Sequence, residues 1–334
     1  MRTRSKKELN APAKPNEPRK ILLMECHNQT TKTMSSIQDL FTIQFWGVRG
    51  SIACPGPETV RYGGNTPCIE MRVGGKRLIF DGGTGLRVLG QSLLSQMPIE
   101  AYMFFTHSHW DHIQGFPFFV PAFVQGNCFQ IYGAIAPNGA TIKQRLTDQM
   151  LHPNFPVPIR AMQADLHFHD LEIKDKVEVG EIKIKNLPLN HPGEAVGYRI
   201  TWNGCCAAYI TDTEHFPNNL DENVIKLARD ADVMIYDATY TDEEYHSSVS
   251  SKVGWGHSTW QEAVKVAKVA NVKQLVIFHH DPLHNDDFLD HVWEQAVQEF
   301  PNTIMAREGL SIELFGPDEQ KKNSVVLQEE IAKV

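Results

Sequence analysis

The sequence predicts an α/β fold in which strands and helices alternate along most of the chain. The first observation is a set of apolar runs of strand length, such as residues 101–105 and 274–278, each followed at once by polar residues. The second is that stretches with helical periodicity, such as residues 288–300, lie between these runs. The third is that histidine and aspartate gather directly after the apolar runs, where open α/β sheets place their functional sites.

The composition is that of a globular protein with an acidic balance. The chain has 334 residues, of which 42% are hydrophobic and 22% charged, and its formal net charge is −8. Proteins that grip long nucleic acid need clustered lysine and arginine, so this balance argues against such a partner. No apolar run approaches the roughly 18 residues of a membrane-spanning helix, so we expect no membrane partner. The six cysteines form no CxxC pair and are expected to be reduced, as in a cytoplasmic protein.

Composition also divides the chain into three parts. Residues 1–39 form a basic, proline-containing tail that cannot bury a core and is expected to be disordered. Residues 40–316 carry the expected strands and helices and form one folded domain. Residues 317–334 form a polar C-terminal tail.

The elements of the folded part follow from apolar periodicity and from turn residues. Glycine-containing pairs at residues 74–75 and 203–204 predict hairpins. Thr259, with Glu262 three residues later, has the capping-box spacing and predicts the start of a helix. We expect strands at residues 41–46, 67–73, 76–80, 101–105, 195–202, 205–210, 232–236, 274–278 and 310–315, with further short strands within 162–187. We expect helices at residues 86–95, 139–151, 220–229, 260–270 and 288–300.

Four side chains of metal-ligand type follow the apolar run 101–105: His107, His109, Asp111 and His112. Imidazole and carboxylate are the usual ligands of zinc and its neighbours. His107 and His109 are two residues apart, so they can point the same way and share one ion. Asp111 and His112 come next and can serve a second ion. The alternative is a polar surface loop that is rich in histidine by chance, but four such side chains at this spacing rarely coincide.

The pattern His107-x-His109-x-Asp111-His112 resembles the HxHxDH signature of the metallo-β-lactamase-fold hydrolases. The resemblance extends from about residue 41 to residue 315, because the family's other motifs follow in the same order. It implies a four-layer αβ/βα sandwich, an α/β fold in which residues 40–316 form the catalytic domain.

The same resemblance implies the rest of a two-metal site. Asp81, in an Asp-Gly-Gly turn at a strand end, would support the ligands from behind without touching the metal. His191, Asp212 and His279 resemble the third, fourth and fifth motifs. The implied ligands are His107, His109 and His191 on one ion, Asp111, His112 and His279 on the other, and Asp212 as the bridge. Nitrogen and oxygen ligands without cysteine favour two Zn²⁺ ions, with Mn²⁺ or Fe²⁺ as alternatives.

The segment around His257 resembles that of tRNase Z and related phosphodiesterases. His257 precedes an expected helix, whose N-terminal partial positive charge suits a phosphate. By this resemblance His257 stabilises the phosphate and protonates the leaving oxygen, while Asp237 at the preceding strand end pairs with it. The family often has Glu at that position. The implied catalytic residues are Asp111, His257 and Asp237, and the alternative for His257 is a spectator at the start of a helix.

The function predicted from these residues is a dinuclear phosphodiesterase acting on a small or cyclic nucleotide. The net charge and the absence of a recognisable basic arm weigh against tRNA as substrate. The alternatives are RNA 3′-end processing, hydrolysis of a thioester or β-lactam, and a ligand-sensing protein without turnover. A homodimer is a further expectation, to which the apolar stretch 116–123 could contribute.

Overall fold

A computed structural model describes residues 20–21 and 41–316 of the chain. The predicted C-terminal tail, residues 317–334, lies outside the described residues, as does most of the predicted N-terminal tail, residues 1–39. Lys20 and Ile21 are the exception. They form a short strand, β1 (Lys20–Ile21), which pairs in parallel with residues 176–177, a pairing that the sequence did not predict.

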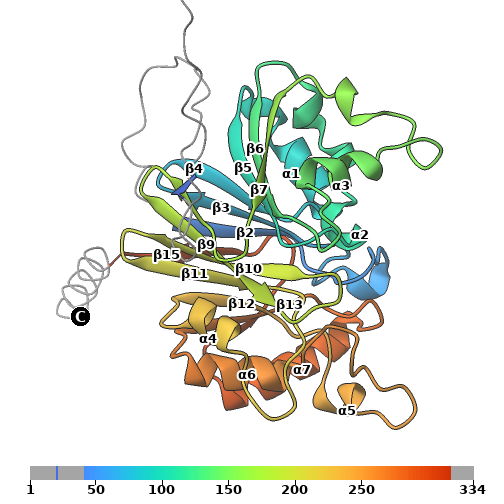
Figure 1. Cartoon of the computed structure of the whole chain (residues 1–334). Coiled ribbons are helices and arrows are strands. Elements are labelled where there is room, and N and C mark those ends of the chain that lie inside the picture. The colour runs from blue at the N-terminus through green and yellow to red at the C-terminus, as the bar shows by residue number, and fades with distance from the viewer. Residues whose placement is uncertain (1–19, 22–40, 317–334) are drawn as a thin grey trace, which may run out of the picture.

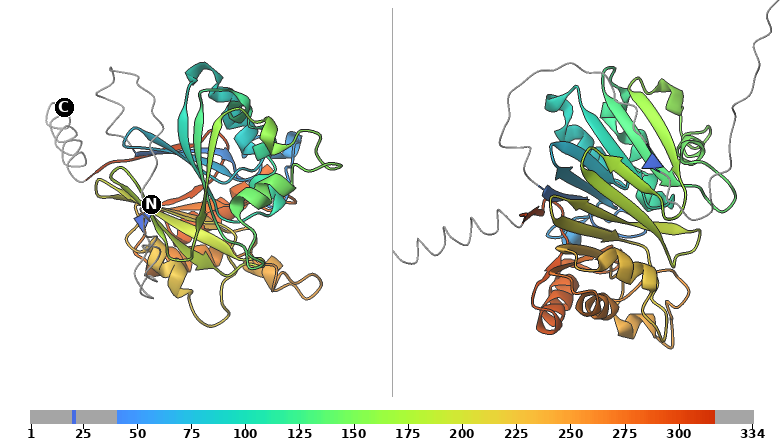
Figure 2. Two further views of the ribbon diagram at one scale, coloured as in Figure 1. Left: turned by 45° about the horizontal axis from the view of Figure 1, so that its top comes forward. Right: turned by 60° about the vertical axis from the view of Figure 1, so that its left-hand side comes forward.

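Two β-sheets pack face to face, and helices cover the outer face of each (Figure 1; Figure 2). The strand order is β1-β8-β9-β10-β11-β12-β13-β14 in one sheet and β15-β2-β3-β4-β5-β6-β7 in the other. In Figure 1 the helices α4, α6 and α7 lie below the first sheet, and α1 and α3 lie beside the second. The predicted four-layer αβ/βα sandwich is therefore confirmed.

The strands of the first sheet after β1 are β8 (Lys176–Val179), β9 (Ile182–Leu189), β10 (Ala195–Trp202), β11 (Cys205–Ile210), β12 (Val233–Asp237), β13 (Gln274–Phe278) and β14 (Thr303–Met305). Those of the second are β2 (Phe41–Gly47), β3 (Cys68–Val73), β4 (Lys76–Phe80), β5 (Glu100–Phe105), β6 (Cys128–Ala134), β7 (Asp165–Leu171) and β15 (Ser311–Leu314). The α-helices are α1 (Gly85–Ser92), α2 (Trp110–Ile113), α3 (Ile142–Asp148), α4 (Glu222–Ala228), α5 (Asp242–Tyr245), α6 (Trp260–Val269) and α7 (Asp286–Glu299). Short 3₁₀ turns lie at Pro57–Thr59, Leu94–Gln96, Phe116–Phe118, Val120–Phe123 and Ile159–Ala161.

Local sequence accounts for most of these elements. In β2, buried residues alternate with half-buried ones, as expected when one face of a strand meets a core. β11 and β12 are buried along their whole length because both faces of their sheet are covered. At the start of α6, the Thr259 side chain accepts a hydrogen bond from the backbone N–H of Glu262, as the capping spacing predicted.

Three apolar cores hold the four layers together. One lies between the two sheets and includes Phe80, Phe104 and Tyr198. A second joins the first sheet to α4, α6 and α7, and a third joins the second sheet to α1 and α3. The stretch 116–123 belongs partly to this third core, in which Phe116 and Phe119 are buried.

Strand direction brings the predicted site residues to one edge of the sandwich. β11, β12 and β13 run in parallel, so residues 212, 237 and 279 lie at the same end of the first sheet. β9 runs the same way, because β10 is antiparallel to both β9 and β11. In the second sheet, β4 and β5 are parallel and end next to residues 81 and 106.

Other details differ from the sequence-based expectations. The strands β6 and β14 were not predicted, and residues 111–112 lie in the short helix α2 rather than in a loop. Cys128 is disulfide-bonded, so the expectation that all six cysteines are reduced is wrong for this residue. Within the described residues, no helix combines the length and the apolar character that crossing a membrane requires.

The core between the sheets provides a test of the fold. Phe104 is fully buried, and its ring stacks on those of Phe80 and Tyr132 at centroid distances of 5.3 and 4.7 Å. Phe104→Ala should lower the free energy of unfolding by about 3–5 kcal/mol, because it removes a large side chain from a packed interior. Phe118→Ala is the matched control, since Phe118 is 51% exposed, and should cost less than about 1 kcal/mol. Equal effects in urea denaturation would contradict this packing.

Candidate metal centre

Three residues of the site adopt a left-handed backbone one or two residues after a strand. The φ angles are +59° at Asp81, +55° at Asp212 and +64° at His279. Non-glycine residues rarely adopt this conformation, and it is found mainly where the surrounding structure enforces it at functional sites. Each of these side chains lies among the other predicted site residues, as described below.

The first group of possible ligands contains His107, His109, His191 and Asp212, whose ligand atoms all lie within 4.8 Å of one another. His107 follows β5, His191 follows β9 and Asp212 follows β11. Nε2 of His107 and Nε2 of His191 each lie 3.6 Å from Oδ2 of Asp212. Nδ1 of His109 lies 3.0 Å from Nε2 of His191. The two sheets thus supply one compact set of nitrogen and oxygen atoms.

The second group contains Asp111, His112, Asp212 and His279, again with all ligand atoms within 4.8 Å. Nε2 of His112 lies 3.1 Å from Oδ1 of Asp212 and 3.3 Å from Oδ2 of Asp111. Nε2 of His279 lies 3.3 Å from each of the same two oxygens. The backbone N–H of Ser51 donates to Oδ2 of Asp111 at 2.8 Å, which fixes that carboxylate.

Asp212 belongs to both groups and presents a different oxygen to each. Oδ2 faces His107 and His191, and Oδ1 faces His112 and His279. Burial by itself would raise the pKa of Asp212, but His112, His279 and His107 outweigh it and hold the pKa well below its usual range. The geometry therefore allows one carboxylate to bridge two ions.

The atoms present fit metal binding. Nε2 of His107 and Nε2 of His112 are buried without a hydrogen-bond partner, although an unpaired buried polar atom is costly. In four of the buried histidines the other ring nitrogen, Nδ1, donates a hydrogen bond to a group behind the site. The lone pair of Nε2 is then free to bind a metal. These pairs are His107 Nδ1 with Thr106 Oγ1 (3.0 Å), His112 Nδ1 with Asp81 Oδ2 (2.9 Å), His191 Nδ1 with the Gly256 carbonyl (2.7 Å) and His279 Nδ1 with Thr239 Oγ1 (3.0 Å).

His257 and Asp237 form a hydrogen-bonded pair beside these groups. Nδ1 of His257 donates to Oδ2 of Asp237 at 2.9 Å, and the His257 ring stacks on that of His279 at 4.9 Å. Burial disfavours the imidazolium, but the Asp237 carboxylate outweighs burial and raises the pKa of His257 to about 9. Asp237, His257 and His279 also lie close enough to hold an ion, but Nδ1 of His257 already donates to the carboxylate. The pair is therefore arranged to carry a proton on His257.

The family follows from comparison with known proteins. A family profile described as "Beta-lactamase superfamily domain" matches residues 76–280, which is more than half of the chain. The chain belongs to this superfamily. It is a metal-dependent hydrolase of the metallo-β-lactamase fold.

Individual members of the superfamily resemble the whole domain. The ribonuclease Z of Archaeoglobus fulgidus is 24% identical over 331 residues, covering 82% of this chain and 98% of the relative. The metallo-β-lactamase fold protein YhfI from Bacillus subtilis is 18% identical with a TM-score of 0.62, covering 83% of this chain and all of that chain. The short form of human tRNase Z is 18% identical with a TM-score of 0.53, covering 81% and 98%.

These relatives contradict the predicted partners of this superfamily member. The sequence predicted a small phosphodiester or nucleotide as substrate and argued against long nucleic acid. The relatives named ribonuclease Z are by that name enzymes of RNA, which overturns the argument. Its weakness is physical, because a net charge of −8 is a sum over the whole chain and does not locate positive potential at the site. The predicted homodimer stays a prediction.

Sequence reasoning missed several groups that position the ligands. Thr106 and Thr239 hold histidine rings, yet neither residue type signals a site by itself. The signal available was their place, one and two residues after β5 and β12. The Gly256 carbonyl and the Ser51 N–H carry no sequence signal, because any residue offers a backbone group.

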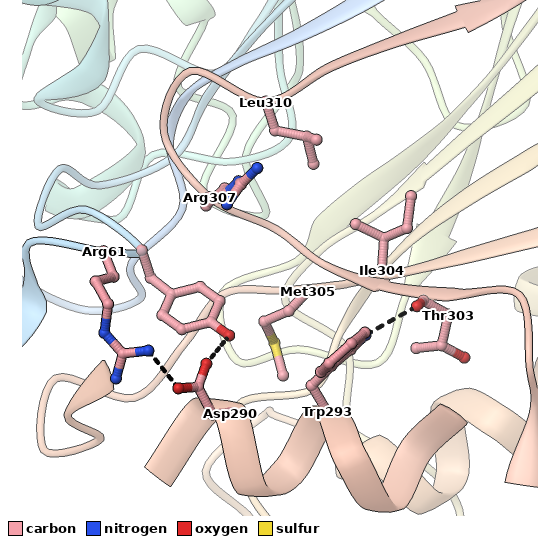
Figure 3. A pocket seen from close by; sticks show the side chains of 9 residues that line it. Arg61, Asp290, Trp293, Thr303, Ile304, Met305, Arg307 and Leu310 are labelled. Carbon is pink, nitrogen blue, oxygen red and sulfur yellow. Dashed lines mark hydrogen bonds and ion pairs between the residues drawn. The ribbon is translucent and has the colours of Figure 1, made fainter. Parts of the chain in front are cut away.

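A separate cavity of about 520 Å³ lies between α7, β14 and the loop before β3 (Figure 3). In its wall, Asp290 accepts hydrogen bonds from Arg61 and, at 2.7 Å, from the hydroxyl of Tyr62. The Tyr62 ring meets that of His280 edge-on at 5.9 Å. No predicted metal ligand lines the cavity, so it is not the metal centre.

Gly50 offers a test of the ligand geometry. A Cβ atom at Gly50 would lie 2.4 Å from Cε1 and Nδ1 of His279, so Gly50→Ala must displace this ring. We expect metal affinity to fall about 10–100-fold, the range seen when groups that orient a ligand are removed. Gly56→Ala is the control, because nothing lies within 4 Å of its Cβ position. Zinc titration with equal affinities for both variants would contradict the arrangement.

Proposed function

We propose that the protein is a dinuclear metal-dependent phosphodiesterase that cleaves RNA, as the name of its ribonuclease Z relatives describes for them. The observation that carries the proposal is the His257–Asp237 pair beside two ligand groups that share Asp212. A thiolate leaves without protonation, so a thioesterase has no need of an imidazole held by a carboxylate next to the metals. The proposal therefore rests on two supports. The site suits cleavage of a phosphodiester, and the relatives named ribonuclease Z act on RNA.

The proposed ligands divide as the distances do. His107, His109 and His191 would hold one ion, Asp111, His112 and His279 the other, and Asp212 both. When bound, two divalent ions, for which these nitrogen and oxygen ligands favour Zn²⁺, would supply Lewis acidity and a hydrolytic nucleophile at neutral pH. Asp81 takes no part in binding, and it orients His112 through the hydrogen bond to Nδ1.

His257 performs the proton transfer in this scheme. Its Nδ1 is engaged by Asp237, so Nε2 is the nitrogen that can face the substrate. Water adds to phosphorus and loses one proton to solvent, the bond from phosphorus to the leaving ribose oxygen breaks, and that oxygen takes the proton from Nε2. Solvent then returns a proton to Nε2. Asp237 stabilises the imidazolium before transfer, and it also accepts the backbone N–H of Thr213 at 3.0 Å, one residue from the bridging Asp212.

The test of this function uses the metal-loaded protein and a precursor tRNA with a 3′ extension. We expect cleavage that a chelator abolishes and that Asp212→Ala reduces roughly 100-fold or more, since even groups behind metal ligands typically contribute 10–100-fold. Bis-p-nitrophenyl phosphate is the control substrate. Hydrolysis of this ester without any cleavage of RNA would contradict the proposal that RNA is the substrate. If protein that holds two metals per chain hydrolyses neither substrate, the proposed phosphodiesterase activity is wrong.

His257→Ala tests the general acid. Both metals should stay bound, because His257 lies outside the two shared groups, while RNA cleavage should fall about 10²–10⁴-fold. The loss should be smaller on bis-p-nitrophenyl phosphate, because p-nitrophenolate leaves without protonation. Kinetics on both substrates and elemental analysis measure this. Loss of metal, or equal losses on the two substrates, would show that His257 has another role.

A further inference from the structure

The turn from Lys252 to Gly256 is held against the metal centre by one carboxylate. Glu214, which is 9% exposed, accepts hydrogen bonds from the backbone N–H groups of Gly254 at 2.6 Å and Gly256 at 2.9 Å, and from the Tyr245 hydroxyl. The carbonyl of Gly256 in turn accepts from Nδ1 of His191. The turn is therefore fixed relative to a proposed metal ligand, and α5, from which it leads, lies at the lower right of Figure 1.

Lys252 on this turn has aromatic neighbours and no carboxylate partner. Its Nζ lies 4.2 Å from the centre of the Trp255 ring and 5.5 Å from that of Tyr240. Among the described residues, no carboxylate lies within ion-pair distance of it. Carboxylates do neutralise other lysines of the described chain, which are Lys76, Lys226, Lys265, Lys268 and Lys273. The positive charge of Lys252 is thus left available to a ligand.

This charge is one aromatic ring away from the proposed acid. The Tyr240 ring meets that of His257 edge-on at 6.2 Å. The backbone N–H of Tyr240 also donates to the carbonyl of Ser258, the residue after His257, at 3.1 Å. Trp255 is 56% exposed, so part of its ring is open to solvent. An ammonium and an open aromatic ring thus stand together beside the place where the bond would be cut.

We propose that the turn from Lys252 to Gly256 binds the nucleotide next to the bond that is cut. Lys252 binds the phosphate of that nucleotide, and Trp255 stacks on its base. Every nucleotide of RNA carries a phosphate and a base with a flat face, so this site takes RNA of any sequence. The inference rests on RNA as the substrate of the proposed function, and it gives an acidic chain a local means of holding RNA.

Binding is the primary measurement, so that the outcome does not depend on cleavage. A labelled single-stranded RNA is titrated with metal-loaded protein at several salt concentrations, and fluorescence anisotropy gives the affinity. Lys252→Ala should weaken binding several-fold. It should also make the slope of log affinity against log salt about 0.7 less negative, the loss of one phosphate contact. Lys76→Ala is the matched control, because Lys76 Nζ lies 5.8 Å from the Tyr102 ring at the start of β4, the end opposite Asp81.

Trp255 is tested by two variants and two ligands. Trp255→Ala should weaken RNA binding about tenfold, and Trp255→Phe should retain most of the affinity, because a smaller ring still stacks. An abasic oligomer with the same backbone should bind wild type and Trp255→Ala equally. Loss of affinity for both ligands would show that the substitution disturbs the turn, and it would overturn stacking as the role of Trp255.

Several results overturn the site itself. These are an absence of RNA binding by wild type, an unchanged salt slope in Lys252→Ala, and equal losses of turnover by Lys252→Ala on RNA and on bis-p-nitrophenyl phosphate. The last would mean that the turn acts through His257. RNA binding that depends on Lys252 and Trp255, without cleavage by wild type, would support the site and overturn the proposed function alone.

Discussion

One buried carboxylate, Asp81, connects both sheets to the metal centre. It is 1% exposed and accepts hydrogen bonds from the backbone N–H of Thr106 at 2.8 Å, from Nδ1 of His112 at 2.9 Å and from the hydroxyl of Tyr209 at 2.8 Å. A buried charge without such partners would cost several kcal/mol. Because Thr106 follows β5 of one sheet and Tyr209 lies in β11 of the other, the carboxylate is satisfied only when the sheets pack correctly. Ligand geometry and sheet packing thus depend on each other.

The left-handed backbone at Asp81, Asp212 and His279 is a second constraint of the same kind. Each such residue costs of order 1–3 kcal/mol, and it persists only where the surroundings determine it. Here the strands that precede these residues are buried, and each side chain is held at its far end by partners on other elements. The apolar cores on both faces of each sheet therefore stabilise the strained turns. With this backbone conformation, each of the three residues directs its side chain from the end of a strand into the shared centre.

The sequence could point to the proposed ligands because their signals are local. His107 to His112 lie within six residues, and His279 directly follows an apolar run, so neither needed knowledge of distant contacts. Glu214 shows the limit. It stands two residues after Asp212, yet the backbone groups that it binds are Gly254 and Gly256, and no pattern in the sequence connects them. The strands β6 and β14 were missed because their pairing with neighbours, rather than apolar periodicity alone, defines them.

Net charge misled the prediction of partners because it sums charges over the whole chain, while solvent ions screen the charges that lie far from the site. At physiological salt a charge acts over about 8 Å, so most of the acidic side chains are too far away to be felt by a phosphate at the centre. The seven proposed ligands include five histidines and only two carboxylates, Asp111 and Asp212. Two divalent ions would bring four positive charges against those two carboxylates and those of Asp81 and Asp237 behind them, and the His257 imidazolium would add a fifth positive charge. A centre of this composition attracts a phosphate even in a chain of net charge −8, and the unpaired Lys252 beside it acts in the same direction.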